Sequence, residues 1–173
     1  MKKIAVILAD GMEELEALTP VDVLRRAGAS VDTISIKEKI VVSSHGVGVV
    51  ADKLLSQVDL DEYYGVILPG GMPGAKNISE NAVVVNAVKK ALKSNKLVSA
   101  ICASPAVILA THGLLEGYTA SCYPAPDFIN AIGDKYVNQN VCTSNNLITA
   151  NGPKSAFEFA LAICEYLKLN PKF

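Results

Sequence analysis

Residues 96–105, KLVSAICASP, constrain the fold more than any other stretch of the sequence. The apolar run at residues 97–101 predicts a strand that is buried on both faces of a parallel sheet. Ser104 and Pro105 then predict the N-cap and the first residue of a helix. The chain must therefore turn from strand to helix within about two residues, with Cys102 on the turn, which is typical of a nucleophile elbow.

The position of Cys102 predicts a reactive thiol. Free N–H groups at the start of a helix place positive partial charge beside the sulfur, so they are expected to lower the thiol pKa. A buried structural cysteine is the alternative, because free cysteines are among the most buried residues in proteins. The elbow alone leaves both interpretations open.

Length and composition predict one domain over residues 1–173 with a sizeable core, since half of the residues are hydrophobic. The net charge of −1 and the scattered Lys and Arg residues argue against binding to nucleic acid or to an anionic membrane. Small uncharged or weakly charged partners are expected instead. The apolar run at residues 4–9 is too short for a signal peptide and is interrupted by Asp10, so a strand is predicted there.

The cysteines show no CxxC spacing and have no paired histidines nearby, so we expect no zinc site, no other metal and no cofactor. A disulfide framework is not expected either, because a chain this apolar does not need one. A reducing, cytoplasmic location fits best. Apart from Cys102, we expect the thiols to be packing residues; they are Cys122, Cys142 and Cys164.

Strands alternate with helices along the chain, which predicts an α/β fold with a mostly parallel sheet and helices on both faces. Pro20 is expected to kink or split the first helix. The weak pattern after residue 117 suggests only short elements. Strands are expected at residues 3–9, 30–36, 63–68, 97–101, 118–122, 135–143 and 146–150, a hairpin at 40–51, and helices at 13–27, 81–94, 105–113, 127–132 and 154–169.

Two features are predicted at the carboxyl edge of this sheet. Glu13 and Glu14 suit a helix N-terminus, whereas Glu16 lies on another face of the helix and can point toward the sheet. The glycine-rich loop at residues 69–74 allows positive φ and a close approach of the backbone. Its N–H groups can face an oxyanion, or the loop can be a tight connection, and the residues favour neither interpretation.

Neither histidine is an obvious base for Cys102. His45 is expected to be a solvated turn residue or to lie at a pocket mouth. His112 falls at the end of the helix after Cys102, roughly 15 Å away at helical rise. Residues 46–51 match the dinucleotide fingerprint G-x-G-x-x-A, but no helical pattern follows, so a glycine-containing hairpin explains them better.

Five motifs in order resemble the ThiJ/PfpI superfamily, most closely the branch of the parkinsonism-associated deglycase. The resemblance covers nearly the whole chain and is highly specific. It implies a single ThiJ/PfpI-type domain at residues 1–173, a flavodoxin-like three-layer sandwich and usually a homodimer. The motifs are ILADGMEELE at residues 7–16, PVDVLRRAG at 20–28, LPGG at 68–71, AICA at 100–103, and GP at 152–153 followed by FEFALAI at 157–163.

The resemblance also implies roles for individual residues. Cys102 matches the reactive cysteine of the family, and Glu16 matches its partner acid, which is protonated and hydrogen-bonded to the sulfur. Gly71 and Ala103 match the residues whose backbone N–H groups form the oxyanion site. Candidates for the pocket lining are Gly70, Tyr123, His45 and Asn151.

The chain departs from the family pattern at two positions. Protease-like members carry a histidine directly after the cysteine, where this chain has Ala103, so a cysteine peptidase is disfavoured. The related branch places a histidine before a proline near the cysteine, where this chain has Tyr123 and Pro124. A phenol with a pKa of about 10 is a poor base at neutral pH, so Glu16 is the better proton shuttle.

The resemblance implies a glyoxalase or deglycase that acts without a cofactor on methylglyoxal or on glycated protein or thiol adducts. Cys102 would add to the aldehyde carbon, Glu16 would move protons, and the two amides would hold the oxyanion. The missing histidine predicts a slow enzyme. The alternative is a redox sensor or stress-response chaperone in which Cys102 is oxidised to sulfinate. An amidotransferase-like hydrolase is a third, weaker hypothesis.

Overall fold

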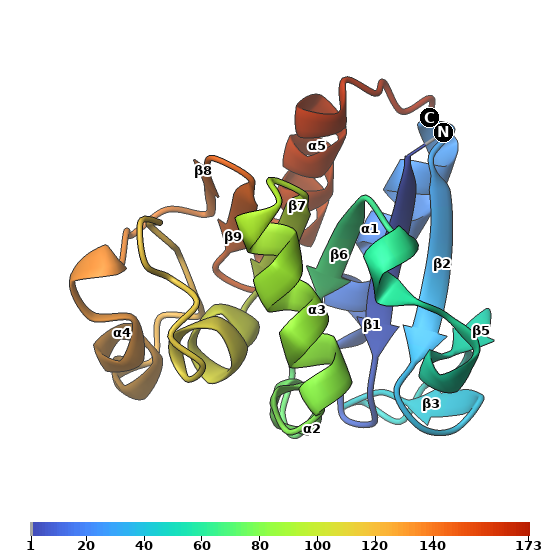
Figure 1. Cartoon of the computed structure of the whole chain (residues 1–173), viewed down its shortest axis with the longest axis horizontal. Helices are drawn as coiled ribbons and strands as arrows, with labels where there is room; N and C mark the ends of the chain where they lie inside the picture. The colour runs from blue at the N-terminus through green and yellow to red at the C-terminus, as the bar shows by residue number, and fades with distance from the viewer. Residues whose placement is uncertain (1) are drawn as a thin grey trace.

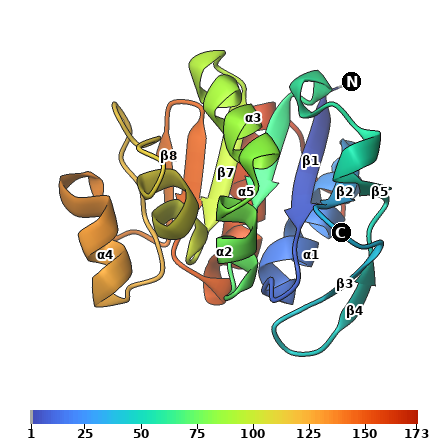
Figure 2. The ribbon, with the colours of Figure 1, turned by 60° about the horizontal axis from the view of Figure 1, so that its bottom comes forward.

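The computed structural model describes residues 2–173 and is built on a seven-stranded sheet (Figures 1 and 2). The strand order is β5-β2-β1-β6-β7-β9-β8. All neighbours pair in parallel except β8 and β9, which form an antiparallel hairpin at one edge. The strands are β1 (Lys3–Leu8), β2 (Ser30–Ser35), β5 (Lys53–Leu54), β6 (Gly65–Leu68), β7 (Leu97–Ile101), β8 (Val141–Ser144) and β9 (Leu147–Ala150).

Helices cover both faces of the sheet, as Figure 2 shows. One face packs against α1 (Glu14–Arg26) and α5 (Ala156–Leu167). The other packs against α2 (Gly74–Ser79), α3 (Ala82–Lys93) and a π-helix at Pro105–Ala110, next to which lies α4 (Pro126–Ile132). Short 3₁₀ turns occur at Leu55–Gln57, Leu60–Glu62, Gly133–Lys135 and Pro153–Ser155. The predicted three-layer, flavodoxin-like α/β architecture is confirmed.

Alternating side chains of β1 enter two separate cores. Ile4, Val6 and Leu8 face α1 and α5, whereas Ala5 and Ile7 face α3. A strand with apolar neighbours on both faces reads in sequence as a continuous apolar run. No helix in the described residues is both long and apolar enough to cross a membrane.

Two local details of the helices differ from the expectation. Pro20 does not split α1, which runs without a break from Glu14 to Arg26 and is held by its buried apolar face. Ser104 occupies the N-cap position and Pro105 begins the helix, as expected, but the Ser104 hydroxyl group does not cap the helix; it donates to the carbonyl of Pro69 at 2.5 Å. In both places a buried tertiary contact outweighs the local preference of the residue.

The chain after residue 117 forms less regular structure than expected. Residues 118–122 contribute only a single bridge, between Ala120 and Tyr136, and β8 begins at Val141, later than expected. The sequence pattern also did not reveal α2 or β5, which are six and two residues long. Elements this short carry too few side chains to show a period.

The predicted hairpin is present as β3 (Ile40–Val42) and β4 (Gly48–Val50), which form a separate antiparallel pair. It is followed by β5 and a short 3₁₀ turn instead of the α-helix that a dinucleotide site requires, so the fingerprint is a coincidence of glycines. The hairpin is fastened to the loop before α1 by the Gly11 N–H group, which donates to Val42 O at 2.8 Å. The Ser44 N–H group donates to Met12 O at 2.7 Å.

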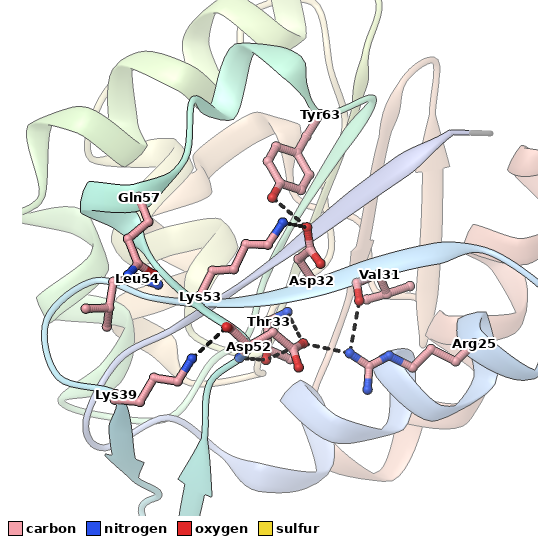
Figure 3. A network of polar contacts seen from close by, with 10 residues as sticks. All are labelled: Arg25, Val31, Asp32, Thr33, Lys39, Asp52, Lys53, Leu54, Gln57 and Tyr63. Carbon is pink, nitrogen blue, oxygen red and sulfur yellow. Dashed lines mark hydrogen bonds and ion pairs between the residues drawn. The ribbon is translucent and has the colours of Figure 1, made fainter.

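Polar contacts hold the edge of the sheet at β2 and β5 (Figure 3). The carboxylate of Asp52 accepts hydrogen bonds from the N–H group and the hydroxyl group of Thr33, both at 2.8 Å, and from Arg25 Nη2 at 2.6 Å. On the neighbouring residue of β2, Asp32 accepts from Lys53 Nζ at 2.8 Å and from the Tyr63 hydroxyl group at 2.7 Å. These bonds tie α1 and β5 to β2.

Candidate functional site

Cys102 lies on the sharp turn that follows β7, as the elbow pattern predicts. Its φ of +64° is in the left-handed region, which is costly for a residue with a side chain. Two main-chain hydrogen bonds hold this conformation. The Cys102 N–H group donates to Ala150 O at 2.9 Å, and the Tyr123 N–H group donates to Cys102 O at 2.8 Å. The turn places the sulfur at the carboxyl edge of the parallel strands, where ligands usually bind.

Glu16 reaches the same point from the first turn of α1 and is fully buried. Its Oε2 atom accepts the Gly70 N–H group at 2.8 Å. The thiol of Cys102 lies within hydrogen-bonding reach of the carboxyl group, but Oε1 has no well-aligned donor in the described chain. A buried oxygen without a donor is best satisfied when it carries the proton itself, because the O–H group can then donate to the sulfur.

Burial raises the pKa of Glu16 from its ordinary value to about 7. The hydrogen bond with Cys102 lowers this pKa, the charge of Glu13 raises it, and the hydrogen bond from Gly70 lowers it. Glu16 therefore changes its protonation state near neutral pH, which is the property expected of a general acid and base.

The expected lowering of the Cys102 pKa is wrong while Glu16 is ionised. Burial raises the pKa of the thiol, and the negative charge of Glu16 raises it further. Backbone N–H groups of Gly71 and Ala103 bond the sulfur and act in the opposite direction. A proton on Glu16 removes the repulsion, so thiol and carboxyl group titrate as one pair that shares a proton.

The loop at residues 69–74 packs tightly against Cys102 and Glu16. A Cβ atom on Gly70 would lie 2.5 Å from Glu16 Oε2 and 2.6 Å from Cys102 Cβ. Gly71 has a φ of +82°, and a Cβ atom there would lie 2.4 Å from Glu13 N. Both glycines are needed for the backbone to approach the site this closely. The loop therefore does more than connect a strand to a helix.

Tyr123 and Asn151 lie beside this centre. They line a cavity of about 500 Å³ together with residues 124, 140 and 152–155. The Tyr123 side chain is 47% exposed, and its hydroxyl group makes no hydrogen bond within the described residues. Asn151 accepts a hydrogen bond from the Ser155 hydroxyl group at 2.6 Å, which fixes the cavity wall.

The two histidines contact groups other than the sulfur. His45 is not among the residues that line the cavity; its Nδ1 atom lies 3.0 Å from Glu14 Oε2. His112 Nε2 contacts Ser79 O at 2.9 Å, at the far end of the π-helix segment. The structure thus brings Cys102, Glu16 and the two glycines together, and leaves both histidines outside the group.

Sequence reasoning missed the main-chain groups that hold the site. The carbonyl group of Ala150 holds Cys102, and the carbonyl group of Pro69 holds Ser104. A pattern of side chains in the sequence does not indicate where a main-chain carbonyl group will lie. The expectation that Glu13 suits the helix N-terminus is confirmed, because its Oε2 atom accepts the Glu16 N–H group at 2.9 Å.

Known proteins resemble this one in both amino-acid sequence and fold. Protein DJ-1 homolog B of Arabidopsis thaliana is 42% identical over 165 residues, covering 94% of this chain and 37% of that protein. The chain thus spans less than half the length of this relative. Glutathione-independent glyoxalase DJR-1.2 of Caenorhabditis elegans is 37% identical over 169 residues, covering 96% of this chain and 90% of that protein.

A solved structure shows the same architecture. Oxidized DJ-1 of Toxoplasma gondii superposes with a TM-score of 0.92 at 44% identity, covering 96% of this chain and 91% of that chain. The model of the DJ-1/PfpI family matches residues 2–166. With a family match over almost all of its length and relatives at this level of identity, the chain belongs to the DJ-1/PfpI family.

Proposed function

We propose that this protein is a cysteine-dependent enzyme of the glyoxalase or deglycase type that acts on reactive aldehydes such as methylglyoxal. The observation that carries the proposal is the pairing of Cys102 with a fully buried Glu16 whose pKa is about 7. The nematode relative described as a glutathione-independent glyoxalase supports it.

The reaction needs no external oxidant. The Cys102 thiolate adds to the aldehyde carbon, and the carbonyl electron pair moves to oxygen, where Glu16 delivers its proton. The amides of Gly71 and Ala103 hold the oxygen while it is charged. Glu16 then takes the proton from the former aldehyde carbon and returns it to the neighbouring carbon, while the hydroxyl proton on the first carbon passes to the neighbouring oxygen. The first carbon is thereby oxidised to a thioester carbonyl group and the second is reduced to an alcohol. Water cleaves the resulting thioester to lactate and free Cys102.

Deglycation follows from the same first step. An adduct of methylglyoxal with an amine or thiol presents a carbon that the Cys102 sulfur can attack once the adduct opens to the aldehyde. The cavity of about 500 Å³ that Tyr123 lines lies next to the elbow, outside Cys102 and Glu16 themselves, and has room for the remainder of an adduct larger than methylglyoxal. We therefore include glycated protein and thiol adducts among the proposed substrates.

The test is conversion of methylglyoxal to lactate by the wild type, Cys102→Ser and Glu16→Gln, with thiol buffers and trace metals controlled. We expect Cys102→Ser to be inactive and Glu16→Gln to lose at least about a hundredfold in rate, as for removal of a general acid or base. Cys164→Ser and Glu165→Gln are matched controls, because these residues lie on α5 outside the site. A silent wild type, or full activity in Cys102→Ser, contradicts the proposal.

A redox sensor or stress-response chaperone is the second candidate. Cys102 is the one cysteine of the described chain that is not fully buried, and the N–H groups of Gly71 and Ala103 beside it can also hold a sulfinate. Mild peroxide should then add two oxygen atoms to the intact mass of the wild type and none to Cys102→Ser. Ready oxidation in a protein that converts no aldehyde would favour this candidate.

The quaternary state and the location are part of the same proposal. We propose a homodimer, supported by the exposed apolar side chains of Leu15, Val47 and Val50 on α1 and the hairpin. Sedimentation velocity tests it. We also propose a reducing, cytoplasmic location, which the four free cysteines support.

A further inference from the structure

A second group of chemically versatile side chains lies at the start of α1, outside the cysteine site. Glu13, Glu14 and His45 each offer one ligand atom, and these atoms lie within 4.8 Å of one another. His45 Nδ1 is 3.0 Å from Glu14 Oε2 and 4.0 Å from Glu13 Oε1. Ser44 Oγ adds a fourth polar atom, 3.4 Å from Glu14 Oε2 and 3.3 Å from His45 Nδ1.

The charges in this group do not balance without a further cation. Two adjacent carboxylates meet here, and within residues 2–173 neither forms an ion pair with a lysine or an arginine. Glu13 is only 9% exposed, and its Oε1 atom points at His45 without a hydrogen-bond donor among the described residues. Glu13 Oε1 is thus a carboxylate oxygen with a free acceptor position on the side that faces His45, which an ion or a proton can fill.

The backbone holds the group in place. The Glu13 N–H group donates to Gly70 O at 3.0 Å, while Glu13 Oε2 accepts from Glu16 N. On the opposite side, the Ser44 N–H group donates to Met12 O, and the Val47 N–H group donates to Ser43 Oγ at 3.0 Å. The turn that carries His45 is therefore fastened to the helix start that carries the two glutamates. The ligand atoms converge without any rearrangement of the backbone.

We propose that Glu13, Glu14 and His45 form a binding site for a divalent transition-metal ion such as Zn²⁺. An imidazole nitrogen and carboxylate oxygens are ordinary zinc ligands at about 2.0–2.2 Å, which puts neighbouring ligand atoms about 3.3 Å apart in a tetrahedron. The two separations from His45, 3.0 and 4.0 Å, need side-chain adjustments of less than about 1 Å to reach this geometry, and the pair of carboxylate atoms, within 4.8 Å, needs at most about 1.5 Å. The fourth position falls to Ser44 Oγ or to water.

The ligand set also selects among cations. Imidazole favours zinc, copper, iron and nickel, whereas Mg²⁺ and Ca²⁺ prefer oxygen ligands alone. The sequence did not reveal this site, because His45 lies in a hairpin turn far along the chain from the two glutamates. The proposal is independent of the aldehyde chemistry at Cys102, since it uses none of the residues that act in that reaction.

The test is isothermal titration of ZnCl₂ into metal-free Cys102→Ser protein, in which the reactive thiol cannot bind zinc. We expect one ion per chain. His45→Ala and Glu14→Gln should each weaken binding by at least about tenfold, the lower end for loss of a supporting group at a metal site. His112→Ala removes the other histidine and should bind as the parent does, and MgCl₂ should not compete.

A second measurement separates loss of a ligand from loss of fold. His45 is 70% exposed at its side chain, so His45→Ala should keep the thermal midpoint of the parent. In the parent, zinc should shift the ring resonances of His45 before those of His112 in an NMR titration. Equal zinc binding by His45→Ala, no binding by the parent at millimolar zinc, or equal binding of magnesium would each overturn the proposal.

Discussion

Cys102 and Glu16 are close enough that the protonation of one decides the charge that the other can carry. Burial penalises both charged forms, and an ionised Glu16 repels a thiolate. When the pair holds one proton, Cys102 and Glu16 share it, and the N–H groups of Gly71 and Ala103 favour the form in which the sulfur is the thiolate. At the scale of single residues, reactivity is therefore a property of the pair.

The pair predicts a pH profile for the thiol. Alkylation of Cys102 by iodoacetamide should speed up as the pH rises through about 7, because the pair then loses its first proton and can form the thiolate. Intact mass gives the rate. In Glu16→Gln the remaining thiol titrates alone, so the step near neutral pH should be absent. A step of the same size and position in this variant would contradict the assignment.

Tyr123 provides a second prediction at this scale. Its backbone bonds Cys102, but its hydroxyl group has no partner among the described residues, so Tyr123→Phe should change the rate of aldehyde conversion by less than about threefold. Tyr123→His should raise the rate at neutral pH, because an imidazole titrates near 6.5 and can share the proton transfer. Steady-state kinetics measures both. A large loss in Tyr123→Phe would mean that the phenol takes part.

The elbow was predictable residue by residue, whereas its electrostatics were not. Apolar residues followed by Cys102, a small residue and Pro105 report a local turn, and the resemblance adds Glu16. The pKa of Cys102 depends on its burial and on a carboxyl group that comes from a different element. His45 was similarly ambiguous, because the helix start that it contacts is distant in sequence.

At the scale of elements, the secondary structure of the long segments follows from local sequence preference, whereas that of the short segments depends on tertiary contacts. The amphipathic pattern of α3 and the N-cap at Asn81, which accepts the Val84 N–H group at 3.1 Å, made that helix predictable. The segment after Cys102 shows the opposite case. Ser104 gives its hydroxyl group to Pro69, and the following turns widen to a π-helix, a shape common near functional sites that no propensity indicates.

Asp52 provides a prediction about how the elements are held together. Asp52→Ala removes hydrogen bonds to Thr33 and Arg25 that join β2, β5 and α1 (Figure 3). Hydrogen bonds to a charged group contribute about 1.5–3 kcal/mol, which the partial exposure of Asp52 reduces, so we expect a loss of about 1–2 kcal/mol in the free energy of unfolding at neutral pH. Urea denaturation measures it.

The pH dependence of this loss has a definite sign. Hydrogen bonds and the charge of Arg25 lower the pKa of Asp52 in the folded state. Its contribution is therefore present above the unfolded pKa of about 3.9 and is lost as the pH falls through the folded pKa. The difference between wild type and Asp52→Ala should shrink in acid. Asp134→Ala, at a carboxylate that is 93% exposed, should cost less than about 0.5 kcal/mol at either pH.

At the scale of the whole molecule, two apolar cores on opposite faces of one sheet support a polar site at its edge. The fold class was predictable, because alternating strand and helix patterns with buried parallel strands permit few arrangements. Where the site lies also follows from that topology, since β1, β6 and β7 all end at the same edge. The cavity beside Tyr123 was not predictable, because it is formed by loops from three parts of the chain.

The raised pKa of Glu16 makes the stability of the whole protein depend on pH. Folding raises the pKa of Glu16 from 4.5 to about 7, so the folded state holds its proton more tightly than the unfolded chain does. The resulting stability is fully present below the unfolded pKa and is lost as the pH rises through about 7. Across that range the wild type should lose up to about 3 kcal/mol that a glutamine at this position does not lose.

Glu16→Gln should therefore be a much slower enzyme but a relatively more stable protein at high pH. Urea denaturation under reducing conditions, on both proteins at mildly acidic and mildly alkaline pH, measures the difference in free energy of unfolding. Groups such as His45 titrate equally in both proteins and cancel in that difference. The free energy of unfolding of the variant should increase relative to that of the wild type as the pH rises. A difference that stays constant with pH would show that Glu16 does not titrate near neutrality, and its role as the proton shuttle would then have to be abandoned.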